Sequence, residues 1–212
     1  MADADHWTRA WTDARDRLAA KGLLRPGSGA LSLRRPGDGV LLGGVAADEA
    51  PRPLEPAAAD SLDGLALHGL IYQARADVGA VLDLGGPFSR LLPAFGGRMP
   101  QAFDEQARHL GPMPAAVADP RGLDRALAGG GQAITVADRV LCLAPASGRL
   151  VLNAELFEKC AKAWLLATGA GGPVRPLPGW VRWIANSRLA KDRTRAAAAF
   201  ARGEAPAESK GY

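Results

Sequence analysis

Two aspartates follow apolar stretches of the chain at places where a carboxylate could do chemistry. Asp83 lies near the end of the apolar run 78–84, and Asp138 lies in a tight turn between the runs 132–136 and 139–143. Two carboxylates that meet in a fold can divide acid and base work, because one charge raises the pKa of the other. Arg139 could neutralise one of them or hold a substrate carboxylate. Both aspartates also suit structural work, since Asp commonly caps helices and supports turns.

A histidine and two glycine-rich turns supply the other candidate groups. His68 lies in an apolar helical pattern, where it is either a catalytic group or a hydrogen-bonded core residue. The turns 26–29 and 43–44 could offer backbone N–H groups to an anion. Ordinary chain reversals explain the same glycines equally well. The anion-binding candidates in these turns are Ser28, Gly29, Gly43 and Gly44.

The elements that position these residues follow from the spacing of apolar side chains. In the first half of the chain, we expect a helix over 4–20, strands over 30–34 and 40–42 around a hairpin turn, a loop over 46–59, a helix from Asp60 or Ser61 to Arg75, a strand over 78–84, and a helix from Pro87 through Leu92. Asp or Ser at the start of the second helix can cap it.

The second half of the chain has the same mixed character. We expect a weak strand over 115–117, a helix over 123–127, strands over 132–136 and 139–143, a long helix over 146–168, and a helical stretch to about 202. Hairpin strands covered by helices predict an α/β fold, with three α/β/α layers around a mainly antiparallel sheet. The expected organisation is one domain over 1–170, followed by a basic helical extension and tail over 171–212.

Composition and charge exclude several classes of protein. Hydrophobic residues make up 48% and charged residues 23% of the chain, which indicates a globular protein rather than a disordered one. No N-terminal signal peptide and no membrane span is expected. Cys142 and Cys160 lie in apolar surroundings without metal-ligand spacing, which favours buried thiols in a reducing, cytoplasmic environment.

The segment 173–212 carries eight basic and three acidic residues, although the net charge of the chain is only +4. One interpretation is contact with an acidic partner or a nucleic-acid backbone. The other is an amphipathic helix that docks Trp180, Trp183 and Leu189 on a neighbouring subunit while its basic face stays in water. The second is favoured because the alanine content indicates a helix rather than a recognition surface, so nucleic acid is not an expected partner.

The string LHGLIYQARADVGAVLDLGG, residues 67–86, resembles the class II aldolase/adducin family, whose fold is that of fuculose-phosphate aldolase. Three further strings extend the resemblance: GLLRPGSGALSLR upstream, and MPQAFDEQARHLGPMP and ADRVLCLAPASGRLVLNAELFEKCAKA downstream. Together they cover about 7–167. The resemblance implies a divalent metal ion held by three histidines, which polarises a carbonyl while a Glu acts as acid or base.

This sequence departs from the family at each of those points. Asp83 and Gly85 stand in place of two metal-binding histidines, and Asp138 stands in place of the third. Gly64 replaces the acid/base Glu, for which Asp63 could substitute. We therefore expect no cofactor and no metal bound in the family's manner.

The resemblance further implies a homo-oligomer, a tetramer with its site between subunits. A small-molecule ligand would then bind in the inter-subunit cleft, where Tyr212 of the C-terminal tail could contribute.

Three functions remain open. The first is a metal-free oligomeric binding or regulatory protein, a pseudoenzyme on the aldolase scaffold. The second is a lyase or decarboxylase, metal-independent or with an atypical metal, that acts on a small oxygenated or carboxylated compound through Asp83, Asp138 and His68. The third is anion or nucleic-acid binding through the basic tail.

Overall fold

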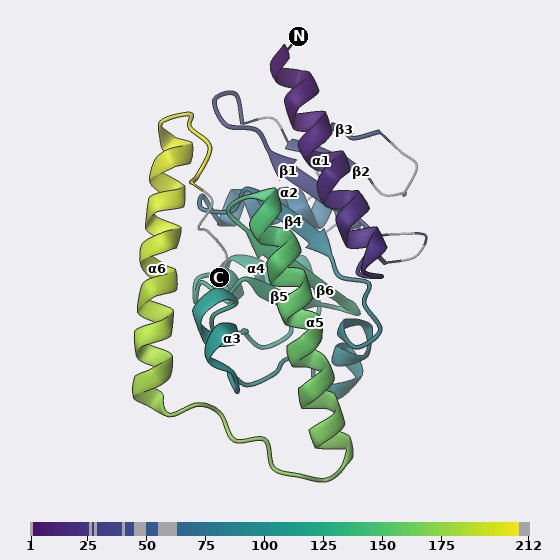
Figure 1. Ribbon diagram of the computed structural model, residues 1–212, viewed down its shortest axis with the longest axis vertical. Coiled ribbons are helices and arrows are strands. Elements are labelled where there is room, and N and C mark those ends of the chain that lie inside the picture. The colour runs from purple at the N-terminus through teal and green to yellow at the C-terminus, as the bar shows by residue number, and fades with distance from the viewer. Residues whose placement is uncertain are drawn as a thin grey trace.

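The computed structural model describes residues 2–25, 27, 29–39, 41–44, 50–54 and 63–207. These residues form one six-stranded antiparallel sheet in the order β3-β2-β1-β4-β6-β5 (Figure 1). Its strands are β1 (Leu31–Arg34), β2 (Leu41–Gly44), β3 (Arg52–Pro53), β4 (Ala80–Asp83), β5 (Ala133–Val136) and β6 (Arg139–Ala144). The expected mixed α/β fold on an antiparallel sheet is confirmed.

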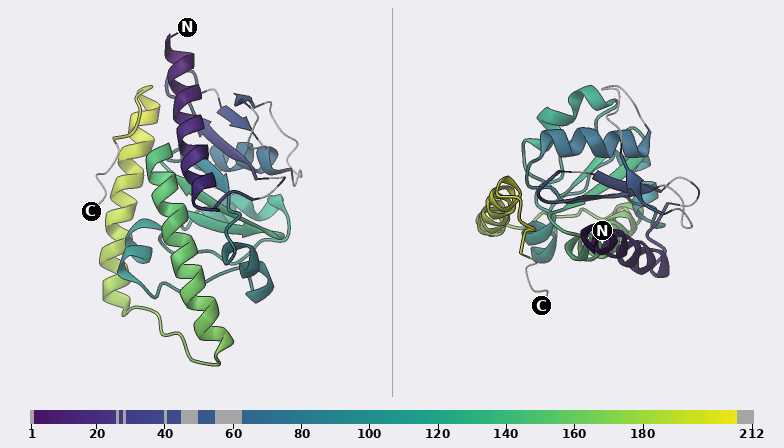
Figure 2. Two further views of the ribbon diagram at one scale, coloured as in Figure 1. Left: turned by 45° about the vertical axis from the view of Figure 1, so that its right-hand side comes forward. Right: turned by 90° about the horizontal axis from the view of Figure 1, so that it is seen from above.

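The helices cover both faces of this sheet (Figure 2). Helices α1 (Ala2–Ala20) and α5 (Ser147–Gly169) pack on one face, in a core that includes Trp11, Leu82 and Phe157. Helices α2 (Gly64–Ala74) and α4 (Leu123–Leu127) pack on the other, against Val81 and Leu141. Because neighbouring strand residues face opposite sides, Asp83 lies on the same face as Val81, under α2.

Several boundaries differ from the sequence expectations. Asp63 caps α2, accepting the Ala66 N–H at 3.4 Å, whereas the expected caps Asp60 and Ser61 lie outside the described residues. The helix expected from Pro87 is a 3₁₀ helix, η1 (Ser89–Phe95), that contains Pro93; proline has no N–H to continue an α-helical ladder.

The expected loop over 46–59 and the expected strand over 115–117 also differ from the structure. The loop expected over 46–59 contains the short strand β3. The weak strand expected over 115–117 is a single bridge from Val117 to Val136.

Helix α6 (Gly179–Ala201) is fixed to the body of the protein by ion pairs and packs along α3 (Asp104–His109). Arg193 donates from Nε to Asp77 at 3.1 Å, and Arg108 of α3 donates to Asp192 at 2.6 Å. Asp77 also receives two 2.7 Å hydrogen bonds from Arg75, whose side chain is buried. Burial acts to raise the pKa of Asp77, but Arg75 and then Arg193 hold it below its ordinary value.

No helix among the described residues is long and apolar enough to cross a membrane. Cys142 and Cys160 are both buried free thiols, and burial raises the pKa of each to about 12.

We predict that Asp77→Ala lowers the free energy of unfolding by about 3–5 kcal/mol, because it leaves Arg75 buried without its carboxylate. The pKa of Asp77 is depressed in the folded state, so its contribution is complete above the unfolded-state pKa and is lost as pH falls below about 4. Urea titration at several pH values measures both effects. Asp13→Ala, which removes an exposed carboxylate beside Arg17, is the control; an equal loss in both variants would contradict the assignment.

Candidate functional site

The candidate site lies where β4 ends, at Asp83. The Asp83 side chain is completely buried, and its backbone N–H donates to Ala30 at 2.8 Å. Arg139, at the start of β6, donates from Nη1 to Asp83 Oδ2 at 2.5 Å. Arg25, from the segment before β1, places Nη1 3.7 Å from Asp83 Oδ1. Two guanidinium groups therefore surround one buried carboxylate.

Arg25 also connects Asp83 with Asp138. Its Nη2 donates to Asp138 Oδ2 at 2.8 Å, and the Asp138 side chain is 73% exposed. Asp138 stands in the β5–β6 turn next to Ala137, whose φ of 51° is left-handed. The four residues Arg25, Asp83, Asp138 and Arg139 are called the charge cluster below. The structure thus brings both predicted aspartates and Arg139 together, with Arg25 between the carboxylates.

The two carboxylates of the charge cluster have opposite pKa shifts. Burial raises the pKa of Asp83 above its ordinary value, although Arg139 and Arg25 act to lower it. The hydrogen bond from Arg25 lowers the pKa of the exposed Asp138. Asp83 Oδ1 has no hydrogen-bond partner among the described residues. Arg25 Nη1 lies 3.7 Å from this oxygen, beyond hydrogen-bond distance.

His68, on α2, belongs to a buried hydrogen-bond chain. Its Nδ1 lies 2.7 Å from Ser32 Oγ, which lies 3.0 Å from Tyr72 Oη, and Tyr72 donates to the Ser32 carbonyl at 2.9 Å. Tyr72 uses its single proton on that carbonyl, so the chain is complete when Ser32 donates to Tyr72 and His68 Nδ1–H donates to Ser32. Nε2 then holds a lone pair, and it has no partner in the described part of the chain.

Burial and then the charge of Arg139 lower the pKa of His68 to about 3. The imidazole is therefore neutral at ordinary pH, as a hydrogen-bonded core histidine would be.

Gly85 allows the chain before β1 to close over the end of β4. Leu24 forms a bridge with Leu84, and the Gly85 N–H donates to the Leu23 carbonyl at 2.8 Å. A Cβ added at Gly85 would lie 2.0 Å from the Arg25 backbone nitrogen, far inside van der Waals contact. Main chain therefore fills the space that any side chain at position 85 would need.

The residues present do not fit the metal that the family resemblance implies. In the described ranges, no three His, Cys, Asp or Glu side chains come together as metal ligands. Position 85 has no room for a ligand side chain, Asp83 already accepts a hydrogen bond from Arg139, and Asp138 already accepts one from Arg25. The cationic groups that face these carboxylates are guanidinium groups of the chain itself.

The described glycines that were expected to bind an anion take part in strand pairing or in a backbone hydrogen bond within the chain. Gly43 and Gly44 are buried residues of β2, paired with Ser32 and Leu31, so the expected loop at 43–44 is wrong. Gly29 donates its N–H to the Arg25 carbonyl at 2.9 Å. Asp63 caps α2, as described above. The candidates Ser28 and Tyr212 lie outside the described residues.

Arg25 is the site residue that the sequence did not reveal. It stands in the string GLLRPGSGALSLR, directly before the glycine turn, and its position within a string that carried the family resemblance was the available signal. Ser32 lies in the same string and is a buried strand residue whose Oγ lies 2.7 Å from His68 Nδ1.

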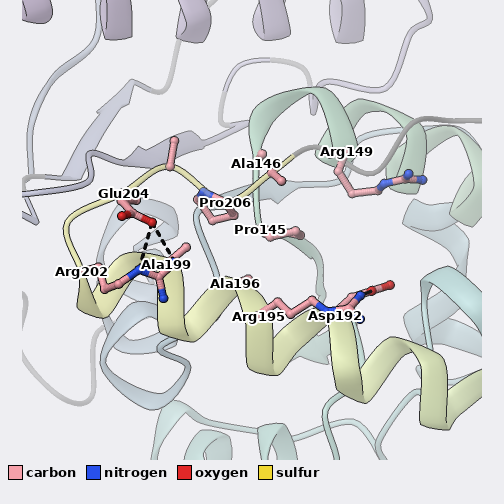
Figure 3. Close-up of a pocket in the computed structure, with 12 residues that line it drawn as sticks. Pro145, Ala146, Arg149, Asp192, Arg195, Ala196, Ala199, Arg202, Glu204 and Pro206 are labelled. Carbon is pink, nitrogen blue, oxygen red and sulfur yellow. Dashed lines mark hydrogen bonds and ion pairs between the residues drawn. The ribbon is translucent and has the colours of Figure 1, made fainter.

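A separate cavity of about 400 Å³ lies between α6 and the start of α5, with Arg195, Arg202 and Glu204 on its rim (Figure 3). It is at the opposite end of β4 from Asp83, since its lining residue Pro145 packs against Gly79. Arg202 pairs with Glu204 at 2.7 Å and Arg195 with Asp192 at 3.3 Å. The charges of this cavity therefore have partners within the chain.

Solved structures of class II aldolases share this fold. L-fuculose 1-phosphate aldolase from Glaciozyma antarctica PI12 is 16% identical, with a TM-score of 0.68 over 95% of this chain and 92% of that chain. YgbL from Escherichia coli is 17% identical, with a TM-score of 0.65 over 85% and 98%. An aldolase II superfamily protein from Pseudomonas syringae is 16% identical, with a TM-score of 0.63 over 93% and 92%. No family model and no curated protein sequence matches the chain.

We predict that Gly85→Ala lowers the free energy of unfolding by at least about 2 kcal/mol, because its Cβ would overlap the Arg25 main chain. The matched control is Gly69→Ala within α2, where an added Cβ meets nothing within 4 Å. That change should stabilise the protein by about 0.5–1 kcal/mol, since Ala favours helix over Gly. Chemical denaturation measures both. A neutral Gly85→Ala would contradict the close approach.

Proposed function

We propose that the protein is a metal-free binding or regulatory protein, built as a homo-oligomer on a three-layer class II aldolase-like fold, and not a classical aldolase. The single observation that carries the proposal is the closure of Leu24 and Arg25 over Gly85. That closure removes the space for one ligand side chain and brings a guanidinium group to Asp83.

The electrostatics of Asp83 support this proposal. Burying a carboxylate without a counter-ion costs several kcal/mol, so a cation must accompany it. Arg139 supplies that cation through a 2.5 Å hydrogen bond, and Arg25 adds a second positive charge. A divalent ion at Asp83 would have to displace or repel both guanidinium groups. Asp83 is therefore a structural anion rather than an available ligand.

Proton-transfer chemistry at neutral pH finds little support in the same residues. A general acid or base works best when its pKa lies near the operating pH. The pKa of His68 is about 3, and Arg25 lowers that of the exposed Asp138. Asp83 has a raised pKa, but it is held between Arg139 and Arg25. The arrangement favours binding over turnover.

The surface of α6 supports assembly with further copies of the chain. Trp180 and Trp183 are 69% and 71% exposed, and Ile184 lies beside them in sequence with 39% exposure. Exposed aromatic clusters of this kind are typical of protein interfaces. The expected docking role of Leu189 is wrong, because Leu189 is buried within its own chain against Gly111.

Three arginines of the C-terminal segment are engaged within the chain and give little support to nucleic-acid binding. Arg193 pairs with Asp77, and Arg195 and Arg202 have acidic partners within the same helix or turn. Binding of a phosphate backbone requires cations that are free to replace its counter-ions.

We predict that the protein purified without chelators carries no stoichiometric zinc, iron, cobalt or manganese, and that added Zn²⁺ or Mn²⁺ does not raise its melting temperature. A ligand that binds only the folded state would raise it. Metal analysis by mass spectrometry and thermal unfolding check both statements. The combined variant Asp83→His, Gly85→His and Asp138→His should also gain no tight zinc site, since main chain occupies the space at position 85. One bound metal per wild-type chain would sink the proposal.

We predict that the wild-type chain is a homo-tetramer and that the double variant Trp180→Ser and Trp183→Ser dissociates into smaller species. Loss of two exposed aromatic anchors removes most of the apolar contact that this face of α6 can make. Light scattering after size exclusion measures the mass. Leu91→Ser, which changes an exposed apolar residue of η1, is the control and should remain tetrameric. A monomeric wild-type protein would contradict the proposed assembly.

A further inference from the structure

In the charge cluster, the Arg25–Asp138 ion pair has an exposed carboxylate, whereas the carboxylate of Asp83 is buried. We propose that Asp138 is an internal occupant of a carboxylate-binding site on Arg25, and that a small carboxylate displaces it to bind there. This inference rests on the proposed function, because it names the ligand class of the same metal-free site.

The geometry leaves the Arg25–Asp138 pair open to solvent. Asp138 Oδ2 accepts from Arg25 Nη2 at 2.8 Å, and the Asp138 side chain is 73% exposed. The Arg25 side chain is 22% exposed, and its Nη2 meets the exposed Asp138 while Nη1 faces buried Asp83. An exposed pair of this kind contributes little to stability and is readily replaced. Asp138 can therefore leave without disturbing the core.

The surroundings of Asp138 stay fixed when it leaves. Arg139 is paired with Val136 in the β5–β6 hairpin, and its side chain is bonded to Asp83. Asp83 is held by the antiparallel pairing of β4 with β6. Arg25 is fixed by the Leu24–Leu84 bridge and by the Gly29 N–H that donates to its carbonyl. The guanidinium is thus preorganised for an incoming group, and only one exposed side chain has to move.

The group now bound to Arg25 is the carboxylate of Asp138, which indicates that the ligand is also a carboxylate. The planar guanidinium fork of arginine matches a carboxylate with two parallel N–H···O hydrogen bonds. Replacement of one carboxylate by another leaves the net charge of the cluster unchanged, with two arginines and two carboxylates. A ligand carboxylate bound to Arg25 therefore takes the place of the Asp138 carboxylate in this pairing. Arg139, 20% exposed, adds a second positive charge beside it.

Titration calorimetry with malonate at constant ionic strength tests the inference. Asp138→Ala removes the competing carboxylate and should strengthen malonate binding by about threefold or more. Arg25→Lys keeps the charge but loses the fork, so it should weaken binding at least fivefold. Asp13→Ala is the matched control: it removes an exposed aspartate paired with an arginine on α1, with the same change in net charge, and should leave the affinity unchanged.

The outcomes separate specific exchange from simple charge effects. Unchanged or weaker malonate binding by Asp138→Ala would overturn the inference, and the variant should fold because Asp138 is exposed. Equal strengthening in Asp13→Ala would also overturn it, since the effect would then be general electrostatics. Tighter binding of inorganic phosphate than of malonate would overturn the carboxylate assignment. These failures differ from that of the proposed function, which a stoichiometric metal ion would contradict.

Discussion

The fully buried carboxylate of Asp83 is the constraint on which the architecture of the candidate site depends. The register of β4 between β1 and β6 places Asp83 on the face covered by α2, away from water. An ionised carboxylate there is tolerated only with positive partners. Arg139 reaches it because the β5–β6 turn returns the chain beside β4. Arg25 reaches it because the chain before β1 crosses the end of the same strand. The charge of Asp83 thereby helps to fix both the chain before β1 and the β5–β6 turn.

The residues at positions 83, 85 and 138 depend on one another physically. The second cation reaches Asp83 only while position 85 has no side chain, since an added Cβ would overlap the Arg25 main chain. Histidine at position 85 would force that segment away and withdraw Arg25 from the buried carboxylate. Asp138 in turn satisfies the outer nitrogen of Arg25. The residues at 83, 85 and 138 therefore form one arrangement with Arg25 and Arg139, in which guanidinium groups supply the positive charge.

The sequence predicted those parts of the fold that depend on residues close together in the chain. Helices α1 and α5 and strand β4 follow from local apolar spacing, and the antiparallel sheet follows from its hairpins. The Arg25–Asp138 contact joins residues 113 positions apart, which no local pattern records. Gly43 and Gly44 were misinterpreted for a related reason. A glycine pair suits a turn, but it equally suits a strand against which distant side chains pack, as those of Trp11 and Leu54 do here.

The two ends of β4 show how exposure decides what an ion pair can do. Before the strand, Asp77 and Arg75 are both buried and fix α6 through Arg193. Breaking that pair would leave a charge in the core, so it serves structure alone. After the strand, Arg25 has one buried and one exposed carboxylate as partners. The buried partner, Asp83, lies against the guanidinium, and the other partner, Asp138, is mostly exposed to solvent. A ligand can compete only at the exposed partner, which is why we place the proposed exchange at Asp138 rather than at Asp83.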